Sequence, residues 1–210
     1  MKFFPWGNSP QVVLALDIGT EIVKALVLRI EANEGRGVII GVGRVAQKPG
    51  NMRSGAVADI NGVIESSRQA IDIAIERAQV RKIGKSIIGI AGELVRGTTT
   101  TVHYSRVSTN LEIGSSELRM IIRKVQEKAF ERIKKQLAWE TGQSNIEVKL
   151  INAAMVSVSI DGYHVQNPTN FQGKEVSMSI FNAYAPLIHL GALETIAKAL
   201  GLDLLSIAAE

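Results

Sequence analysis

Cysteine is absent from the sequence and histidine is rare. Without cysteine, the chain has neither disulfides nor thiolate chemistry. Its three histidines, His103, His164 and His189, are widely spaced and match no pattern of metal ligands. Thiol-dependent enzymes are therefore excluded as a class, and the histidines do not predict a metal site.

Long apolar runs and a strong excess of one charge are also missing. No stretch reaches the roughly 18–20 apolar residues of a membrane span. The opening residues do not form a secretory signal, because Pro5, Gly7 and Pro10 interrupt any apolar core. The formal charge is +4, from 24 basic and 20 acidic residues, which is too small an excess to predict a nucleic-acid partner.

The rest of the composition is that of a folded protein. The chain has 210 residues, a length that suits one large or two small domains. Hydrophobic residues make up 46% of it, which allows a sizeable core and argues against wholesale disorder.

The first region is predicted to be a meander of three strands followed by a helix and a buried strand. A short apolar run ends in Asp-Ile-Gly-Thr, as a buried strand does before a turn. Asp59 or Asn61 is placed to cap the helix. The predicted strands are residues 12–16, 22–30, 38–45 and 86–92.

The middle region changes character and is predicted to be strand–helix–strand–strand. Its long helix runs from Ser115 or Ser116 to about Glu140. The apolar stripe of that helix has three- and four-residue spacing, and consists of Leu118, Ile121, Ile122, Val125, Ala129, Ile133 and Leu137. The predicted strands are residues 98–107, 146–160 and 175–184.

The end of the chain returns to the first pattern. Pro186 is expected to break the chain before a helix over residues 190–200, and Gly201 to cap that helix. A last strand starts at Leu204 with no hairpin partner, so its backbone groups are expected to stay unpaired. The predicted fold class is α/β with a mixed sheet. Its parts are a tail (1–10), a first domain (11–92), an insertion (93–185) and a truncated return (186–210).

The Asp-Ile-Gly-Thr turn is the strongest candidate for a binding site. Gly19 lets the backbone approach an anion without a Cβ in the way, and Thr20 adds a hydroxyl. Asp17 is placed to hold Mg²⁺ through water, since Mg²⁺ favours a carboxylate, retained waters and phosphate oxygens. Ordinary turn chemistry in a hairpin is the alternative interpretation.

Several stretches, taken in order, resemble the bacterial cell-division family FtsA of the actin/Hsp70/sugar-kinase superfamily. The resemblance covers residues 12–208 and implies an actin-like (ribonuclease H-like) subdomain 1A, interrupted by a strand–helix–strand–strand subdomain 1C. The pilus-assembly family PilM shares the fold and the Asp-Ile-Gly…Lys motif, whereas residues 38–59 favour FtsA. The matching stretches are residues 16–20 with Lys24, 38–43, 50–60, 88–92, 163–168 and 173–176.

The resemblance implies ATP and Mg²⁺ as cofactors, bound by Asp17, Gly19, Thr20 and Lys24, with Asp17 holding the metal through water. If the second strand alternates from Ile22, Lys24 points away from the phosphates, so a solvent-facing lysine is the alternative. A second phosphate loop and an adenine pocket are expected beyond residue 210, and the chain is expected to be a fragment or a shortened reading frame. Hydrolysis is not expected of these residues alone.

The same resemblance implies partners and a location. They are FtsZ, bound through regions beyond this chain; other division proteins, bound through 1C; and further copies in filaments. A membrane contact would be made only by a C-terminal helix beyond this chain, and nucleic acid is not expected. The implied location is cytoplasmic, at the inner face of the membrane at the division site.

Three alternatives remain beside this interpretation. One is a PilM-like pilus-assembly homologue, and another is a stand-alone interaction module without nucleotide. A sugar kinase lacks support, because no catalytic carboxylate or sugar pocket is visible. The basic residues of the long helix interleave with glutamates, as on a solvated face. Those basic residues are Arg119, Arg123, Lys124, Lys128, Arg132, Lys134 and Lys135.

Overall fold

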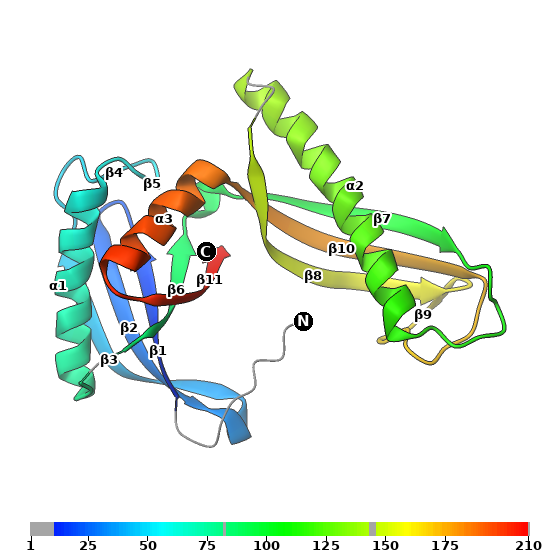
Figure 1. Cartoon of the computed structure of the whole chain (residues 1–210), viewed down its shortest axis with the longest axis horizontal. Coiled ribbons are helices and arrows are strands. Elements are labelled where there is room, and N and C mark those ends of the chain that lie inside the picture. The colour runs from blue at the N-terminus through cyan, green and yellow to red at the C-terminus, as the bar shows by residue number, and fades with distance from the viewer. Residues whose placement is uncertain (1–10, 82, 143–145, 210) are drawn as a thin grey trace. The chain divides into compact units, whose positions relative to one another are not determined.

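The structure is a computed structural model that describes residues 11–81, 83–142 and 146–209. The predicted N-terminal tail, 1–10, lies outside the described residues. The chain divides into two compact units, drawn in Figure 1. Unit 1 lies within residues 1–94 and 187–210, and unit 2 within residues 95–186.

Unit 1 is built on a five-stranded mixed sheet with the strand order β11-β6-β1-β2-β3. The predicted meander is confirmed: β1 pairs antiparallel with β2, and β2 with β3. The last strand returns to this sheet as expected: β11 pairs in parallel with β6, the strand that precedes unit 2 in the chain, and in the described residues it has no hairpin partner on its other side. The strands are β1 (Gln11–Ile18), β2 (Ile22–Glu31), β3 (Arg36–Ala46), β6 (Lys85–Ile90) and β11 (Asp203–Ala209).

Two helices, α1 (Ile60–Ala78) and α3 (Leu187–Ala199), complete unit 1 and pack against each other. Asp59 caps α1 as predicted: its carboxylate accepts a hydrogen bond from the Asn61 N–H at 3.0 Å. α1 lies over β2 and β3. Gly41 and Gly43 of β3 bring the sheet so close to α1 that a Cβ at either glycine would overlap the helix backbone.

Unit 2 is a four-stranded sheet with the order β7-β10-β8-β9 and one long helix. β10 lies between β7 and β8 and is antiparallel to both. The strand–helix–strand–strand order predicted for this region is present, with β9 as a two-residue addition (Figure 1). The elements are β7 (Arg96–Ser105), α2 (Ser115–Thr141), β8 (Val148–Ile160), β9 (Tyr163–His164) and β10 (Glu175–Pro186).

The apolar stripe of α2 forms the core of unit 2. Ile121, Val125, Ala129 and Ile133 are fully buried, as their spacing predicts. They pack against large apolar side chains of β8 and β10 in two clusters, one towards each end of the helix. The sheet residues of these clusters are Val158, Ile160, Val176, Met178 and Ile180 in one, and Val148 and Tyr184 in the other.

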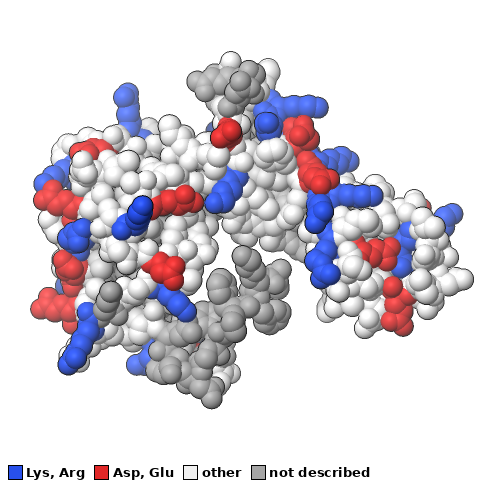
Figure 2. Space-filling view, viewed as in Figure 1, with Lys and Arg blue, Asp and Glu red and all other residues white. Residues whose placement is uncertain are grey.

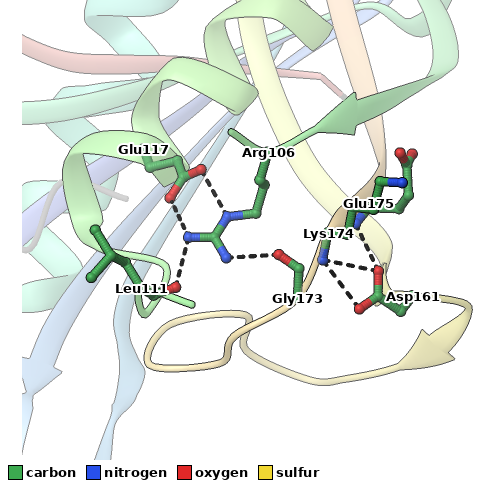
Figure 3. A network of polar contacts seen from close by, with 7 residues as sticks. All are labelled: Arg106, Leu111, Glu117, Asp161, Gly173, Lys174 and Glu175. Carbon is green, nitrogen blue, oxygen red and sulfur yellow. Dashed lines mark hydrogen bonds and ion pairs between the residues drawn. The ribbon is translucent and has the colours of Figure 1, made fainter. Parts of the chain in front are cut away.

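Polar contacts join the loops that follow β7 and precede β10 (Figure 3). The Arg106 side chain is 1% exposed and donates two hydrogen bonds to the Glu117 carboxylate, each of 2.9 Å. It also donates to the carbonyls of Leu111 and Gly173, at 2.9 Å each. This guanidinium therefore ties the first turn of α2 to two loops.

One local detail differs from the expectation. Pro186 is the last residue of β10, and α3 starts directly after it, at Leu187 rather than at residue 190. Two short strands, β4 (Met52–Arg53) and β5 (Ala56–Val57), lie between β3 and α1. α2 begins at Ser115, as predicted, with Gly114 at its N-cap. No helix in the described part of the chain has the length and apolar character needed to cross a bilayer.

Candidate functional site

The candidate site lies at the end of the unit 1 sheet where three parallel strands finish. β1 and β11 both pair in parallel with β6, so β1, β6 and β11 have their carboxyl ends at the same edge. In open α/β sheets, ligands bind in the crevice outside the carboxyl ends of the strands. The predicted Asp-Ile-Gly-Thr turn leaves β1 at this edge.

The turn is tight, and Gly19 makes it possible. The Gly19 N–H donates to the Ile22 carbonyl at 3.2 Å, which closes the turn between β1 and β2. A Cβ at Gly19 would lie 2.7 Å from that carbonyl oxygen, closer than any side chain tolerates. Only glycine therefore allows this backbone to reverse here and stay open to a ligand.

Asp17 and Lys24 face each other across the hairpin. They are direct partners in the register of β1 and β2, so their side chains lie on the same face of the sheet. The Lys24 Nζ is 2.9 Å from an Asp17 carboxylate oxygen, and the two side chains are 47% and 33% exposed. An exposed pair of this kind contributes about 0–1 kcal/mol, so either partner can exchange it for a ligand at little cost.

Lys24 is paired with Asp17 and at the same time half exposed to solvent. Lys24 and Asp17 border a shallow apolar surface formed by Ala15, Leu26 and Ile87. This surface belongs to the face of the sheet opposite α1, because the residues that flank Lys24 in β2 are buried on the α1 side.

The Thr20 hydroxyl is held by a second loop. Its Oγ1 accepts a hydrogen bond from the Gly55 N–H at 3.2 Å. Gly55 and Ser54 form the two-residue connection between β4 and β5, and both have positive φ, at 74° and 47°. A type I′ hairpin turn requires this conformation at both positions. Because the Thr20 oxygen is the acceptor in this hydrogen bond, the hydrogen of the Thr20 hydroxyl can still be donated to a ligand.

Asn51 anchors this second loop to α1. It is 4% exposed, and its carbonyl accepts from the N–H groups of Ala58 and Asp59 at 2.9 and 3.0 Å. Its side chain donates to Gln47 at 2.9 Å and contacts Gly62 of α1, where any Cβ would overlap it. The loop that contacts Thr20 is therefore part of a fixed framework.

A narrow cavity lies beneath the loop and brings His189 of α3 to the same end of the sheet. Ile18, Met52, Gly55 and Leu193 line it together with His189. Burial lowers the pKa of His189 below its usual value of 6.5, so its imidazole is neutral at pH 7.

Unit 1 thus brings Asp17, Gly19, Thr20 and Lys24 to one end of its sheet. Sequence reasoning missed Gly55, although the dipeptide Ser-Gly is a turn signal. It also missed His189, for which no sequence signal exists. No cluster of three or more metal-ligating side chains occurs among the described residues. A divalent ion here would depend on the single Asp17 carboxylate, its waters and the ligand.

Comparisons with known proteins bear on the fold. No protein-family model matches the chain, and neither does any curated protein. Among solved structures, a chain of a PilM–PilN type IV pilus biogenesis complex aligns with a TM-score of 0.57 and 13% identity. The alignment covers 94% of this chain and 47% of that one, so this chain spans about half the length of its structural neighbour.

Two further structures are similar at lower scores. A diol dehydratase-reactivating factor in nucleotide-free form has a TM-score of 0.38 and 9% identity, covering 94% of this chain and 64% of its own. An Aquifex aeolicus member of the Ppx/GppA family has a TM-score of 0.26 and 19% identity. That alignment covers 39% of this chain and 26% of the other. The likeness to the PilM–PilN chain shows the fold alone, which is that of the actin-like ATPases. The mixed sheet of unit 1 is interrupted in the chain by the strand–helix–strand–strand unit 2.

Proposed function

We propose that unit 1 supplies one half of a nucleotide site in an actin-like assembly protein that binds ATP with Mg²⁺. The observation that carries the proposal is the Asp17–Thr20 turn at the shared carboxyl end of β1, β6 and β11. A bare glycine, a carboxylate and a proton-donating hydroxyl converge there, and a second loop holds the hydroxyl in place.

These residues fit the chemistry of a bound Mg²⁺–phosphate group. Asp17 would hold the ion through water, as Mg²⁺ prefers when phosphate oxygens supply its other ligands. Thr20 would donate to a phosphate oxygen, and Lys24, released from Asp17, would offset phosphate charge. Glu21 is exposed, and its carbonyl accepts from the Gln47 N–H at 2.8 Å.

The test is nucleotide affinity in the longest natural form of the protein that contains these residues. We expect Asp17→Ala to weaken Mg²⁺–ATP binding by about tenfold or more in calorimetry, since one metal contact and its orientation are lost. Asp72→Ala, which removes an exposed carboxylate from α1, is the matched control and should leave the affinity unchanged. Equal affinities in the wild type and Asp17→Ala would refute the phosphate role.

For the biological role we propose an FtsA-like adaptor, which links FtsZ filaments to the inner face of the membrane and recruits division proteins through 1C. The support is the residue resemblance at 38–59. A PilM-like role in pilus assembly is the second candidate, favoured by the alignment that covers 94% of this chain. Co-sedimentation with FtsZ filaments, compared with capture by PilN, separates the two roles. Binding to PilN alone would replace the first with the second.

An interaction module without nucleotide makes a different prediction for the same protein. It expects no Mg²⁺–ATP binding in any form that contains residues 1–210. Saturable nucleotide binding that depends on Asp17 therefore excludes it, and its absence in every form supports it.

A further inference from the structure

The outer edge of β7 in unit 2 is a regular strand edge with its backbone groups turned outward. β7 is the end strand of its sheet and pairs with β10 through ten consecutive residue pairs without a bulge. One step beyond this ladder, the Arg106 N–H donates to the Lys174 carbonyl at 2.8 Å. Since hydrogen-bonded and non-bonded pairs alternate along an antiparallel ladder, the even-numbered residues of β7 bond to β10. Residues 97, 99, 101, 103 and 105 therefore direct their N–H and C=O groups away from the sheet.

A lysine contact supports this assignment. The Lys128 Nζ of α2 lies 3.4 Å from the Thr101 carbonyl oxygen, as expected if that carbonyl faces outward. The Thr101 side chain lies on the face of the sheet opposite α2, where its hydroxyl is 2.7 Å from that of Ser179. Thus the backbone groups at this edge point away from the sheet, and a lysine of α2 contacts one of them.

α2 lays a basic stripe along this edge. The helix runs antiparallel beside β7, from Glu117 at Arg106 to Glu140 at Arg96. The stripe consists of four exposed residues at spacings of four, four and three: Lys124, Lys128, Arg132 and Lys135. Besides the Lys128 contact, Lys124 Nζ lies 4.7 Å from the centre of the Tyr104 ring. Figure 2 shows basic side chains along the ridge of α2, with acidic ones between them.

The opposite edge of the sheet differs. β9 covers one end of β8, and the register of β8 against β10 shifts twice, near Ser179 and near Ala183. Bulges of this kind twist an edge away from further pairing. Within unit 2, the long regular edge beside a charged stripe is therefore that of β7.

We propose that the β7 edge binds an extended acidic segment of another protein, which adds to the sheet as a fifth strand. Its backbone would pair with the outward groups of residues 97–105, and alternate side chains would point to the α2 side. Acidic residues at those positions meet Lys124, Lys128 and Arg132. The intervening side chains meet a face of small polar residues that includes Thr99 and Thr101.

Charge decides between this occupant and a second copy of the chain. Two β7 edges paired with each other would bring two basic stripes together, and like charges across a contact oppose association. Exposed lysines on an edge strand also discourage pairing with neutral strands. The stripe therefore selects acidic partners over self-association. The inference is independent of the nucleotide site, since it uses unit 2 alone.

A labelled probe peptide, acetyl-Glu-Thr-Glu-Val-Glu-Thr-amide, tests the proposal by fluorescence anisotropy with the 210-residue chain. We expect saturable binding that weakens as salt is raised. The double variant Lys124→Glu/Lys128→Glu should weaken binding by about tenfold or more. The matched control is Lys134→Glu on the other side of α2, where the ammonium lies 5.5 Å from the Phe130 ring centre. Equal losses in the two variants, or none in either, would refute the proposal.

Strand addition is separated from simple ion pairing by two backbone changes. His103→Pro removes an outward N–H while leaving the β7–β10 ladder intact, as an edge strand tolerates. We expect about tenfold weaker binding, with an unchanged circular dichroism spectrum. A probe N-methylated at alternate residues should fail in the same way, and this arm stands even if the proline variant does not fold.

Other outcomes would overturn the proposal in defined ways. An N-methylated probe that binds as well as the parent would show ion pairing without strand addition. Tighter binding of a single-stranded oligonucleotide of equal charge would make the stripe a nucleic-acid surface. Dimerisation in sedimentation that His103→Pro abolishes would make the occupant a second copy.

Discussion

The two units solve the packing of a helix on a sheet in opposite ways. In unit 1, α1 approaches β3 through Gly41 and Gly43, and the helix residues at the contact are small, such as Ala70 and Ala74. In unit 2, α2 stands off from the sheet on large side chains such as Ile121, Ile133 and Met178. The α1–β3 contact depends on residues with little or no side chain, whereas the contact of α2 with its sheet depends on large side chains that fill the space between them.

The difference predicts opposite sensitivities. A backbone-to-backbone contact has no side chain that can move aside, so unit 1 should resist added atoms. A core of interlocked aliphatic side chains loses dispersion contacts when an atom is removed, so unit 2 should resist cavities. Substitutions in each unit can therefore confirm or break the comparison.

The largest expected effect is a cavity in unit 2. Ile133→Ala removes a fully buried side chain between α2 and β8. We expect a loss of about 4 kcal/mol in the free energy of unfolding, measured by urea denaturation. Lys134→Ala, at the exposed neighbouring position, should stay within about 0.5 kcal/mol of the wild type. A loss below about 1 kcal/mol for Ile133→Ala would show a core that collapses around the gap.

An added methyl group in unit 1 comes next. Gly43→Ala places a Cβ against the Ala70 carbonyl of α1, and neither backbone can yield locally. We expect about 3 kcal/mol of destabilisation, at the upper end for overpacking. The control is Gly191→Ala in α3, where nothing lies within 4 Å of the new Cβ. That change should stabilise the protein by up to about 1 kcal/mol, because alanine favours a helix. If Gly43→Ala and Gly191→Ala both destabilised the protein, the loss would come from replacing any glycine and not from the contact with α1.

Removal of the Arg106 guanidinium tests the polar part of unit 2. Arg106→Leu leaves the Glu117 carboxylate and the carbonyls of Leu111 and Gly173 without their donor. We expect a loss of about 2 kcal/mol, below that of a fully buried pair because Glu117 is 24% exposed. The double variant Arg106→Leu/Glu117→Leu should recover part of it. If the double variant were no more stable than Arg106→Leu, the lost stability would come from the unpaired carbonyls of Leu111 and Gly173.

The smallest expected effect is a difference between the two units in how their stability depends on pH. Because burial lowers the pKa of His189, the unfolded chain binds a proton that folded unit 1 does not, so stability falls as the pH drops below 6.5. Arg106 lowers the pKa of Glu117, and the N–H groups of Glu175 and Lys174 lower that of Asp161. Their contribution is present at neutral pH and is lost below about 4.5, the ordinary value of the glutamate.

Urea midpoints at pH 7.5, 5.5 and 4.0 measure both steps. His189→Gln should reduce the change in urea midpoint between pH 7.5 and 5.5 and leave the change between pH 5.5 and 4.0 as it is. Glu117→Gln should reduce the change between pH 5.5 and 4.0 and leave the other as it is. The opposite result for either variant would contradict the assignment.

Much of the fold follows from the sequence because its patterns are local. The stripe from Ile121 to Leu137 predicts α2, and the aliphatic runs predict β1 to β3. The differences occur where contacts between distant residues set the bounds of an element. β10 extends to Pro186 because that residue forms the last pair of the ladder, opposite Val148. The strand at Leu204 finds its partner in β6, which no local pattern indicates.

The candidate site shows the same division. The turn residues Asp17, Gly19 and Thr20 stand out in the sequence because they are adjacent. Counting outward from the turn pairs Asp17 with Lys24, so hairpin register would have placed that lysine correctly. The Gly55 N–H reaches Thr20 only through the framework around Asn51, and His189 arrives from the far end of the chain. Neither contact has a signature in one sequence.

The ends of unit 2 carry a consequence for how the chain folds. The whole of unit 2 lies between β6 and β11 in the chain, yet these strands are neighbours in one sheet. Arg96 and Tyr184, near the two ends of unit 2, are direct partners across β7 and β10. Once unit 2 has folded, its entry and exit points stand side by side, so β6 and β11 are joined by a short effective loop. Early folding of the insertion would thereby lower the entropy cost of closing the unit 1 sheet.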